Sequence, residues 1–106
     1  MNGVEKTRLE SKIIEALETV YDPEIPANIY DLGLVYAIDI SDAGDVQIQM
    51  TLTTPNCPVA TSLPREVESK VKAIGGVERV NVDVVWDPPW DPGKMTDGAK
   101  LQLGLI

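Results

Sequence analysis

Residues 46–53 read Val-Gln-Ile-Gln-Met-Thr-Leu-Thr, and their strict alternation decides the fold. A period of two predicts a β-strand with one apolar and one polar face. The apolar face holds Val46, Ile48, Met50 and Leu52, and the polar face holds Gln47, Gln49, Thr51 and Thr53. One strand cannot bury its apolar face alone, so its neighbours must complete a sheet and a covering layer.

The preceding segment predicts an antiparallel partner for this strand. Residues 34–41 alternate as well, with Leu34, Tyr36, Ile38 and Ile40 as the apolar positions. Asp42-Ala43-Gly44-Asp45 is a turn signal. A turn this short makes the two strands neighbours in a hairpin.

The helices that would cover this hairpin show a period close to four. Residues 5–20 predict a helix that ends before Pro23, because proline steers Asp22 away from helical angles. A second helix is predicted from about Pro58 or Ser62 to Ala73, ending at Gly75-Gly76. The apolar positions of the two stripes are Leu9, Ile13, Leu17 and Val20, then Leu63, Val67, Val71 and Ile74.

A third strand is predicted over residues 77–86, and a short helix over residues 96–103 with Thr96 as its cap. The intervening Asp87 to Gly93 is too rich in proline for regular structure. The order α-β-β-α-β-(α) predicts an α+β, two-layer sandwich with a three-stranded sheet, in a single domain over residues 1–106. Periodicity alone leaves the pairing of the third strand open.

Composition limits the possible partners. The 106 residues include 17 acidic and nine basic side chains, for a net charge of −8, so nucleic acid and anionic membrane surfaces are poor partners. The sequence has no histidine, which removes the commonest general base and nitrogen ligand for metals. A lone cysteine and the lack of a signal-like or membrane-spanning apolar run are typical of a cytoplasmic protein.

That cysteine, Cys57, lies in Thr53-Thr54-Pro55-Asn56-Cys57-Pro58. A thiol just before a helix-starting proline is placed at a helix N-terminus, where the helix dipole favours the thiolate. The alternative is that Cys57 is a small buried hydrophobic residue. Thr51, Thr53 and Thr54 precede the thiol and could donate hydrogen bonds to a thiolate or a bound ion, although threonine is also an ordinary strand residue.

Two further segments are candidates for the site. Asp22, Glu24 and Asp31 could orient the thiol, bind a cation or dock a partner, but local turn chemistry explains carboxylates in such loops equally simply. Trp86-Asp87-Pro88-Pro89-Trp90 forms a rigid aromatic loop that suits partner binding, since little entropy is lost on contact. The alternative is that one or both tryptophans close the end of the core.

Taken together, the four motifs at residues 22–26, 31–35, 51–58 and 85–90 resemble those of the small SufT and PaaD-like domain family linked to iron–sulfur protein maturation. The resemblance covers nearly the whole chain, and the absence of a cysteine-rich tail favours the SufT branch over the PaaD branch. It implies an α+β fold and a non-enzymatic role in assembling iron–sulfur clusters or delivering them to client proteins. It also implies that Cys57 contacts iron or a labile cluster, supported by Asp22, Glu24, Asp31 and Thr54.

A cluster needs about four ligands, and one Cys57 per chain supplies a quarter of them. The interpretation is therefore transient contact with a cluster, in a homodimer or with assembly scaffold, carrier and client proteins. A second hypothesis is an interaction adaptor that uses the Trp86–Trp90 loop, with a structural Cys57. A third, an enzyme with Cys57 as its nucleophile, lacks a histidine base.

Overall fold

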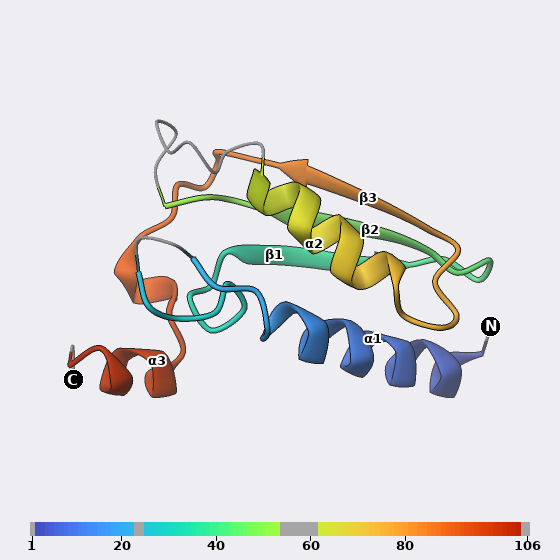
Figure 1. Ribbon diagram of the computed structural model, residues 1–106, viewed down its shortest axis with the longest axis horizontal. Coiled ribbons are helices and arrows are strands. Elements are labelled where there is room, and N and C mark those ends of the chain that lie inside the picture. The colour runs from blue at the N-terminus through green and yellow to red at the C-terminus, as the bar shows by residue number, and fades with distance from the viewer. Residues whose placement is uncertain (1, 23–24, 54–61, 105–106) are drawn as a thin grey trace.

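Three strands form one sheet, and helices α1 and α2 cover one of its faces (Figure 1). The computed structural model describes residues 2–22, 25–53 and 62–104. The elements in chain order are α1 (Gly3–Leu17), β1 (Val35–Ile40), β2 (Asp45–Met50), α2 (Ser62–Lys72), β3 (Arg79–Val84), a 3-10 turn (Pro92–Lys94) and α3 (Asp97–Gln102). This arrangement confirms the predicted α+β class and element order.

The strand order is β1-β2-β3, which answers the question that periodicity left open. β1 pairs antiparallel with β2, as the short turn predicts, and β3 lies parallel to β2 on its other side. Ile48 of β2 therefore lies between Ile38 of β1 and Val82 of β3. A parallel neighbour requires a crossover, and α2 lies in that connection.

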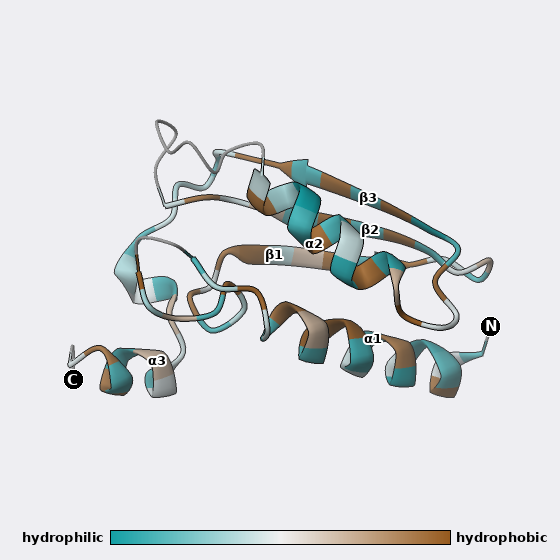
Figure 2. Ribbon diagram, in the orientation of Figure 1, coloured by the Kyte–Doolittle hydropathy of each residue, from teal (hydrophilic) through white to brown (hydrophobic). Residues whose placement is uncertain are grey.

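The core lies between the sheet and the two helices. Ile48 and Met50 of β2 are fully buried. The helix residues packed with them in the core are Leu9, Ile13, Leu17, Leu63, Val67 and Val71. Figure 2 shows hydrophobic and hydrophilic residues alternating along the helices and strands. Each predicted stripe is thus confirmed, and Ile74, which is half-buried, also packs against the core.

Helix α1 ends at Leu17, before the predicted Val20. The Thr19 hydroxyl donates to the carbonyl oxygen of Ala16 (2.6 Å), and the Thr19 N–H donates to the same oxygen (3.1 Å). These bonds replace the helical pattern with a tighter closing turn. Val20 nevertheless remains fully buried.

The predicted alternation of β1 is wrong at Tyr36. Val35 pairs with Met50 but Ala37 pairs with Gln49, so the register shifts between them and Tyr36 is the extra residue of a β-bulge. Val35 packs against the core instead, opposite Met50. The bulge leaves Tyr36 outside the core cluster and available for other contacts.

The C-terminal part differs from prediction in one detail. Pro92–Lys94 forms a 3-10 turn within the segment expected to be irregular, and the Asp91 side chain caps it by accepting from the Gly93 N–H (2.7 Å). Helix α3 follows as predicted, with the Thr96 hydroxyl accepting from the Ala99 N–H (3.2 Å).

Candidate functional site

Several of the described residues of the predicted site lie in segments that meet at one end of the sheet, where β1 begins and β2 ends (Figure 1). Three segments meet there. They are the turn before β1 (residues 20–34), the end of β2 (residues 51–53), and the stretch from β3 to α3 (residues 85–96), which we call the crossing segment.

Asp22 lies in the turn before β1 and is almost fully buried, with 5% of its surface exposed. Its carboxylate accepts from the Ile25 N–H (2.9 Å), and its own N–H donates to the Ala27 carbonyl oxygen (3.1 Å). Ile29 closes the turn by donating its N–H to the Val20 carbonyl oxygen (2.8 Å). Asp22 is therefore bonded to the backbone of Ile25 and Ala27, which is a local role that turn chemistry predicts.

Asp31 is half-buried and is held by Asn28. The Asn28 amide donates to the Asp31 carboxylate (3.0 Å), and the Asp31 N–H donates to the Asn28 side-chain oxygen (2.8 Å). The Asp31 carbonyl oxygen accepts from the Thr96 N–H (2.9 Å), so the backbone of Asp31 also binds the end of the crossing segment.

Gly33 makes that docking possible. Its φ of 78° lies in the left-handed region that favours glycine. A Cβ atom at this position would lie in contact with the backbone carbonyl of Lys94, well inside van der Waals distance. The turn before β1 and the crossing segment therefore approach each other at a point where no side chain fits.

Thr51 lies on the face predicted to be polar, but this end of that face is not exposed. It is fully buried, and its N–H extends the sheet by donating to the Leu34 carbonyl oxygen (2.8 Å). The strand alternation places it on the face away from the helices, close to the Tyr36 hydroxyl. Its hydroxyl oxygen has no hydrogen-bond partner among the described residues.

Tyr36 connects β1 to the crossing segment, and the sequence analysis missed this role. Its hydroxyl donates to the Pro88 carbonyl oxygen (2.8 Å), and the Lys94 ammonium lies 5.7 Å from the centre of its ring. Burial raises the pKa of the Tyr36 hydroxyl above 10.0, the Asp91 carboxylate raises this pKa further, and the Thr51 hydroxyl opposes them. The Thr51 effect is a weak one, because no hydrogen bond of ordinary length joins the two hydroxyls.

The two tryptophans have different environments. Trp90 packs against the core and donates its indole N–H to the Leu32 carbonyl oxygen (2.7 Å), so it closes the end of the core. Trp86 has 46% of its surface exposed. Asp87, Pro88 and Pro89, between them, are exposed as well. Of the two interpretations of this loop, core closure fits Trp90 and partner contact fits Trp86.

The central residue of the predicted site, Cys57, lies outside the described residues, as do Glu24 and Thr54. Thr53, which is described, is half-buried beyond the end of β2. Within residues 2–22, 25–53 and 62–104, no group of three or more histidine, cysteine or carboxylate side chains could hold a metal ion.

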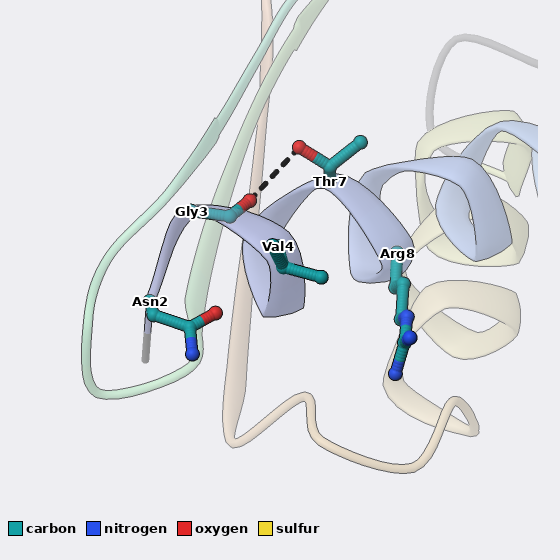
Figure 3. A pocket seen from close by; sticks show the side chains of 5 residues that line it. All are labelled: Asn2, Gly3, Val4, Thr7 and Arg8. Atoms are coloured by element: carbon teal, nitrogen blue, oxygen red, sulfur yellow. Dashed lines mark hydrogen bonds between the residues drawn. The ribbon is translucent and has the colours of Figure 1, made fainter.

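Other features of the surface lie apart from this site. A shallow hollow of about 660 Å³ lies at the start of α1, at the opposite end of the molecule, and Figure 3 shows the residues that line it. They are Asn2, Gly3, Val4, Thr7 and Arg8, none of which was predicted for the site. In the part of the chain that the structure describes, no helix is long and apolar enough to cross a membrane.

Comparison with known proteins places these motifs in a family. Residues 10–84 match the family model described as iron-sulfur cluster assembly protein. A "Fe-S protein maturation auxiliary factor" of Porphyromonas gingivalis is 45% identical, over 92% of each chain. The "Fe-S protein maturation auxiliary factor SufT" of Staphylococcus aureus is 36% identical, over 81% of this chain and 98% of its own.

A solved structure agrees with this assignment. The crystal structure of the DUF59 domain of unknown function from Bacillus anthracis has a TM-score of 0.90 with this chain and is 34% identical to it. The match covers 99% of this chain and all of the other. The fold, the motifs that surround residues 51–58 and the sequence matches agree, and the chain therefore belongs to the family of iron–sulfur cluster assembly proteins that includes SufT.

Proposed function

We propose that this chain is an iron–sulfur protein maturation factor, which assists cluster assembly or delivery to client proteins through the Cys57 thiol and catalyses no reaction of its own. The observation that carries the proposal is the family match over residues 10–84, because this range contains Cys57 and the turn that holds Asp22 and Asp31. The names of the two bacterial maturation factors support the same role.

The cluster is cargo in this proposal. A cluster takes about four ligands, and Cys57 is the only thiol in the chain. The remaining ligands would come from small thiols, from Asp22 or Glu24, or from the protein that gives or receives the cluster. Contact is then transient, which suits a factor that must release what it holds.

The proposed partners are assembly scaffold or carrier proteins and client apoproteins, and the proposed compartment is the cytoplasm. The reducing conditions there keep a lone thiol available. The thiol gains reactivity if its pKa is lowered at the start of a helix, as its position before Pro58 predicts.

Anaerobic reconstitution with iron and sulfide tests the cluster role. Wild type and Cys57→Ser are compared by visible absorbance and Mössbauer spectroscopy, with Thr53→Ser as a control that alters a nearby side chain and keeps the thiol. We expect cluster signals in wild type and the control and their loss in Cys57→Ser. Equal signals in all three proteins, or no signal in any, would contradict a ligand role for Cys57.

A second candidate function, an interaction adaptor, is favoured by the environment of Trp86. This side chain is 46% exposed, on a loop fixed by Trp90 and by the bond between Tyr36 and Pro88. An exposed aromatic side chain on a rigid support is typical of a binding hot spot. In this alternative Cys57 has a structural role and no contact with the cluster.

Maturation of an iron–sulfur apoenzyme, measured as its recovered activity, separates the two functions. A cluster carrier loses function in Cys57→Ser, whereas an adaptor keeps function in Cys57→Ser and loses it in Trp86→Ala. Val4→Ala is the matched control, because Val4 is an exposed apolar residue (62%) at the far end of the molecule. If the Val4 variant is as defective as Trp86→Ala, the effect is not specific to the Trp86 loop.

A further inference from the structure

The outer edge of β3 has no neighbouring strand among the described residues. β3 has β2 on its other side. Natural edge strands are usually protected by bulges, prolines or lysines. β1, the other edge strand, has its bulge at Tyr36, whereas β3 reads Arg-Val-Asn-Val-Asp-Val and pairs with β2 without any register shift.

The valines of β3 are less buried than their neighbours. Val80, Val82 and Val84 face the helices but are only half-buried, while Ile48 and Met50 of the adjacent β2 are fully buried. A strand placed beside β3 would cover the exposed parts of these valines. Pairing at this edge would therefore bury apolar surface of the valines and would also satisfy the outward backbone groups.

The backbone pattern decides which groups point outward. The Val85 N–H donates to the Met50 carbonyl oxygen (2.8 Å), which continues the parallel ladder between β2 and β3. In a parallel pair only alternate residues bond to the neighbouring strand. Asn81 and Asp83 therefore direct their N–H and C=O groups toward β2, and Val80 and Val82 direct theirs to the outer edge. At the start of the strand the pattern is less regular, since the Glu78 N–H donates to the Gly44 carbonyl oxygen (2.9 Å).

On the face away from the helices, β3 has opposite charges at equal distances from its central residue, Asn81. Arg79 and Asp83 are exposed and lie two residues before and two residues after Asn81. A second β3 running antiparallel about Asn81 places Arg79 opposite Asp83 of the partner subunit, and Asp83 opposite Arg79 of the partner subunit. The edge is thus complementary in charge to itself.

We propose that a second copy of this chain pairs with β3 in an antiparallel direction, with Asn81 on the twofold axis, to form a continuous six-stranded sheet. Val80 then faces Val82 of the partner subunit, and these two residues exchange both backbone hydrogen bonds. Arg79 lies in a non-hydrogen-bonded pair, the kind in which opposite Cβ atoms are closest, at about 4.5–5.5 Å.

Other registers fit less well. If the partner strand is shifted by one residue, Val80 lies opposite a partner residue whose backbone groups point toward its own β2. The two residues then cannot form hydrogen bonds with each other, and no ladder forms. A shift of two residues restores the ladder but moves Arg79 away from Asp83 of the partner subunit. Only the register centred on Asn81 satisfies the outward backbone groups and both ion pairs.

This dimer goes beyond the proposed function and does not supply a shared cluster site. The two β3 strands run in opposite directions, so their Val84 ends lie roughly 20 Å apart along the sheet. The ends of β2, from which the Cys57 segments start, lie at these separated ends. Each copy would present its site independently, and the missing cluster ligands would come from another protein or a small thiol.

Charge reversal tests the pairing directly. Arg79→Asp and Asp83→Arg each place like charges opposite one another in the dimer, so each variant should associate about tenfold or more weakly than wild type. A mixture of the two variants should associate as wild type does, because one chain then carries two acids and the other two arginines. The double variant should also recover. The interface is short, so sedimentation velocity should cover protein concentrations from about 10 µM to about 1 mM.

The mixture is the decisive arm, because recovery there cannot come from contacts within one chain. This matters since Arg79 lies opposite Asp45 of β2, and the Asp83 carboxylate accepts from the Gln47 amide (2.8 Å). Asp39→Arg on β1 is the control and should associate as wild type does. The proposal is overturned if wild type stays monomeric at the highest concentration, if either single variant associates as wild type does, or if the mixture fails to recover. Cluster loading plays no part in these measurements, so such a failure leaves the proposed function intact.

Discussion

Several single residues at the end of the sheet have structural roles that another residue type at the same position could not fill. Gly33 combines a positive φ with the close approach of the Lys94 carbonyl. Thr51 is a buried hydroxyl next to the segment that carries Cys57. Tyr36 connects a bulge in β1 to the proline-rich loop through one hydrogen bond. Each of these residues affects the site through the position of the backbone around it.

Gly33→Ala should lower the free energy of unfolding by about 2 kcal/mol or more. The new Cβ forces an unfavourable φ, which alone costs about 1–2 kcal/mol, and it also collides with the Lys94 carbonyl. Urea denaturation measures the loss. Gly98→Ala is the matched control, since nothing lies within 4 Å of a Cβ there and helix α3 favours alanine. Equal stability of the two variants would show that the turn before β1 can move away from Lys94.

The pKa of Tyr36 makes stability depend on pH in the alkaline range. Burial and the Asp91 carboxylate raise this pKa above 10.0, so the folded chain holds the phenolic proton more tightly than the unfolded chain does. The resulting stability is fully present below about pH 10 and is lost as the pH rises through the folded pKa. Tyr36→Phe should remove this part of the pH dependence.

Absorbance titration of the tyrosines, with Tyr36→Phe to identify the signal of Tyr36, checks the cause. Asp91→Asn should lower the pKa of Tyr36, because it removes a nearby negative charge. An unchanged pKa in that variant would mean that the Asp91 charge is too well screened by solvent to contribute.

At the scale of elements, the crossing segment determines how the end of the sheet is closed. It leaves β3, reaches β1 through the Tyr36–Pro88 hydrogen bond, and reaches the turn before β1 through Trp90 and Thr96. The family match ends at residue 84, so most of these contacts come from a part of the chain beyond it.

Trp90→Ala should lower the free energy of unfolding by about 3 kcal/mol, while Trp86→Ala should change it by less than about 1 kcal/mol. Trp90 loses packing against the core and its hydrogen bond to Leu32, whereas Trp86 is 46% exposed. Thermal or urea unfolding of both variants gives the comparison. A larger loss for Trp86→Ala would contradict the division of roles between the two tryptophans.

The elements themselves were predictable because each has a strong local signal. The stripe from Leu9 to Leu17 and the alternation from Val46 to Leu52 are periodic over several turns or pleats. The bulge at Tyr36 was not predictable, because its two neighbours, Val35 and Ala37, are also apolar. Either Val35 or Tyr36 could therefore face the core, and the sequence pattern does not show that one residue is extra. The burial of Thr51 was not predictable either, because a threonine on the polar face of an alternating strand carries no local signal that it is covered.

For the site, the sequence indicated segments of which the structure brings several to one end of the sheet, but it did not indicate the contacts between them. Asp22, Asp31 and Thr51 do gather at one end of the sheet, as their positions before and after strands suggest. The connecting residues Tyr36 and Lys94 escaped notice because an aromatic residue in a strand and a lysine in a loop are individually ordinary. Tyr36 and Lys94 come into contact because the turn before β1 and the crossing segment, which are distant in the sequence, approach each other at Gly33.

For the whole molecule, charge is divided unequally between the two helices and the rest of the chain. Helices α1 and α2 hold six of the nine basic residues and five of the 17 acidic ones, which makes them nearly neutral together. The rest of the chain, with three basic residues against twelve acidic ones, therefore has a net charge of −9, and α1 and α2 together have +1, which gives the total of −8. Self-repulsion within this part opposes the folded state.

Raising the salt concentration should therefore stabilise the protein. From about 10 mM to about 0.5 M NaCl, screening shortens the range of repulsion from roughly 30 Å to a few ångströms, and we expect the melting temperature to rise by a few degrees. The pair between Lys6 and Asp42 (2.6 Å) is exposed, so its loss through screening should offset little of this gain. A melting temperature that falls with NaCl would show that attractive surface pairs outweigh the repulsion.

The mixed sheet also has a consequence for the order of events in folding. β1 and β2 are joined by a four-residue turn, so their pairing closes a very short loop and can form within microseconds. β3 can join β2 only after the chain between Met50 and Arg79 has closed, which carries a larger entropic penalty. The hairpin should therefore act as the template on which α2 and β3 condense. The end of the sheet that holds Thr51 would then reach its final form last, when the crossing segment closes over it.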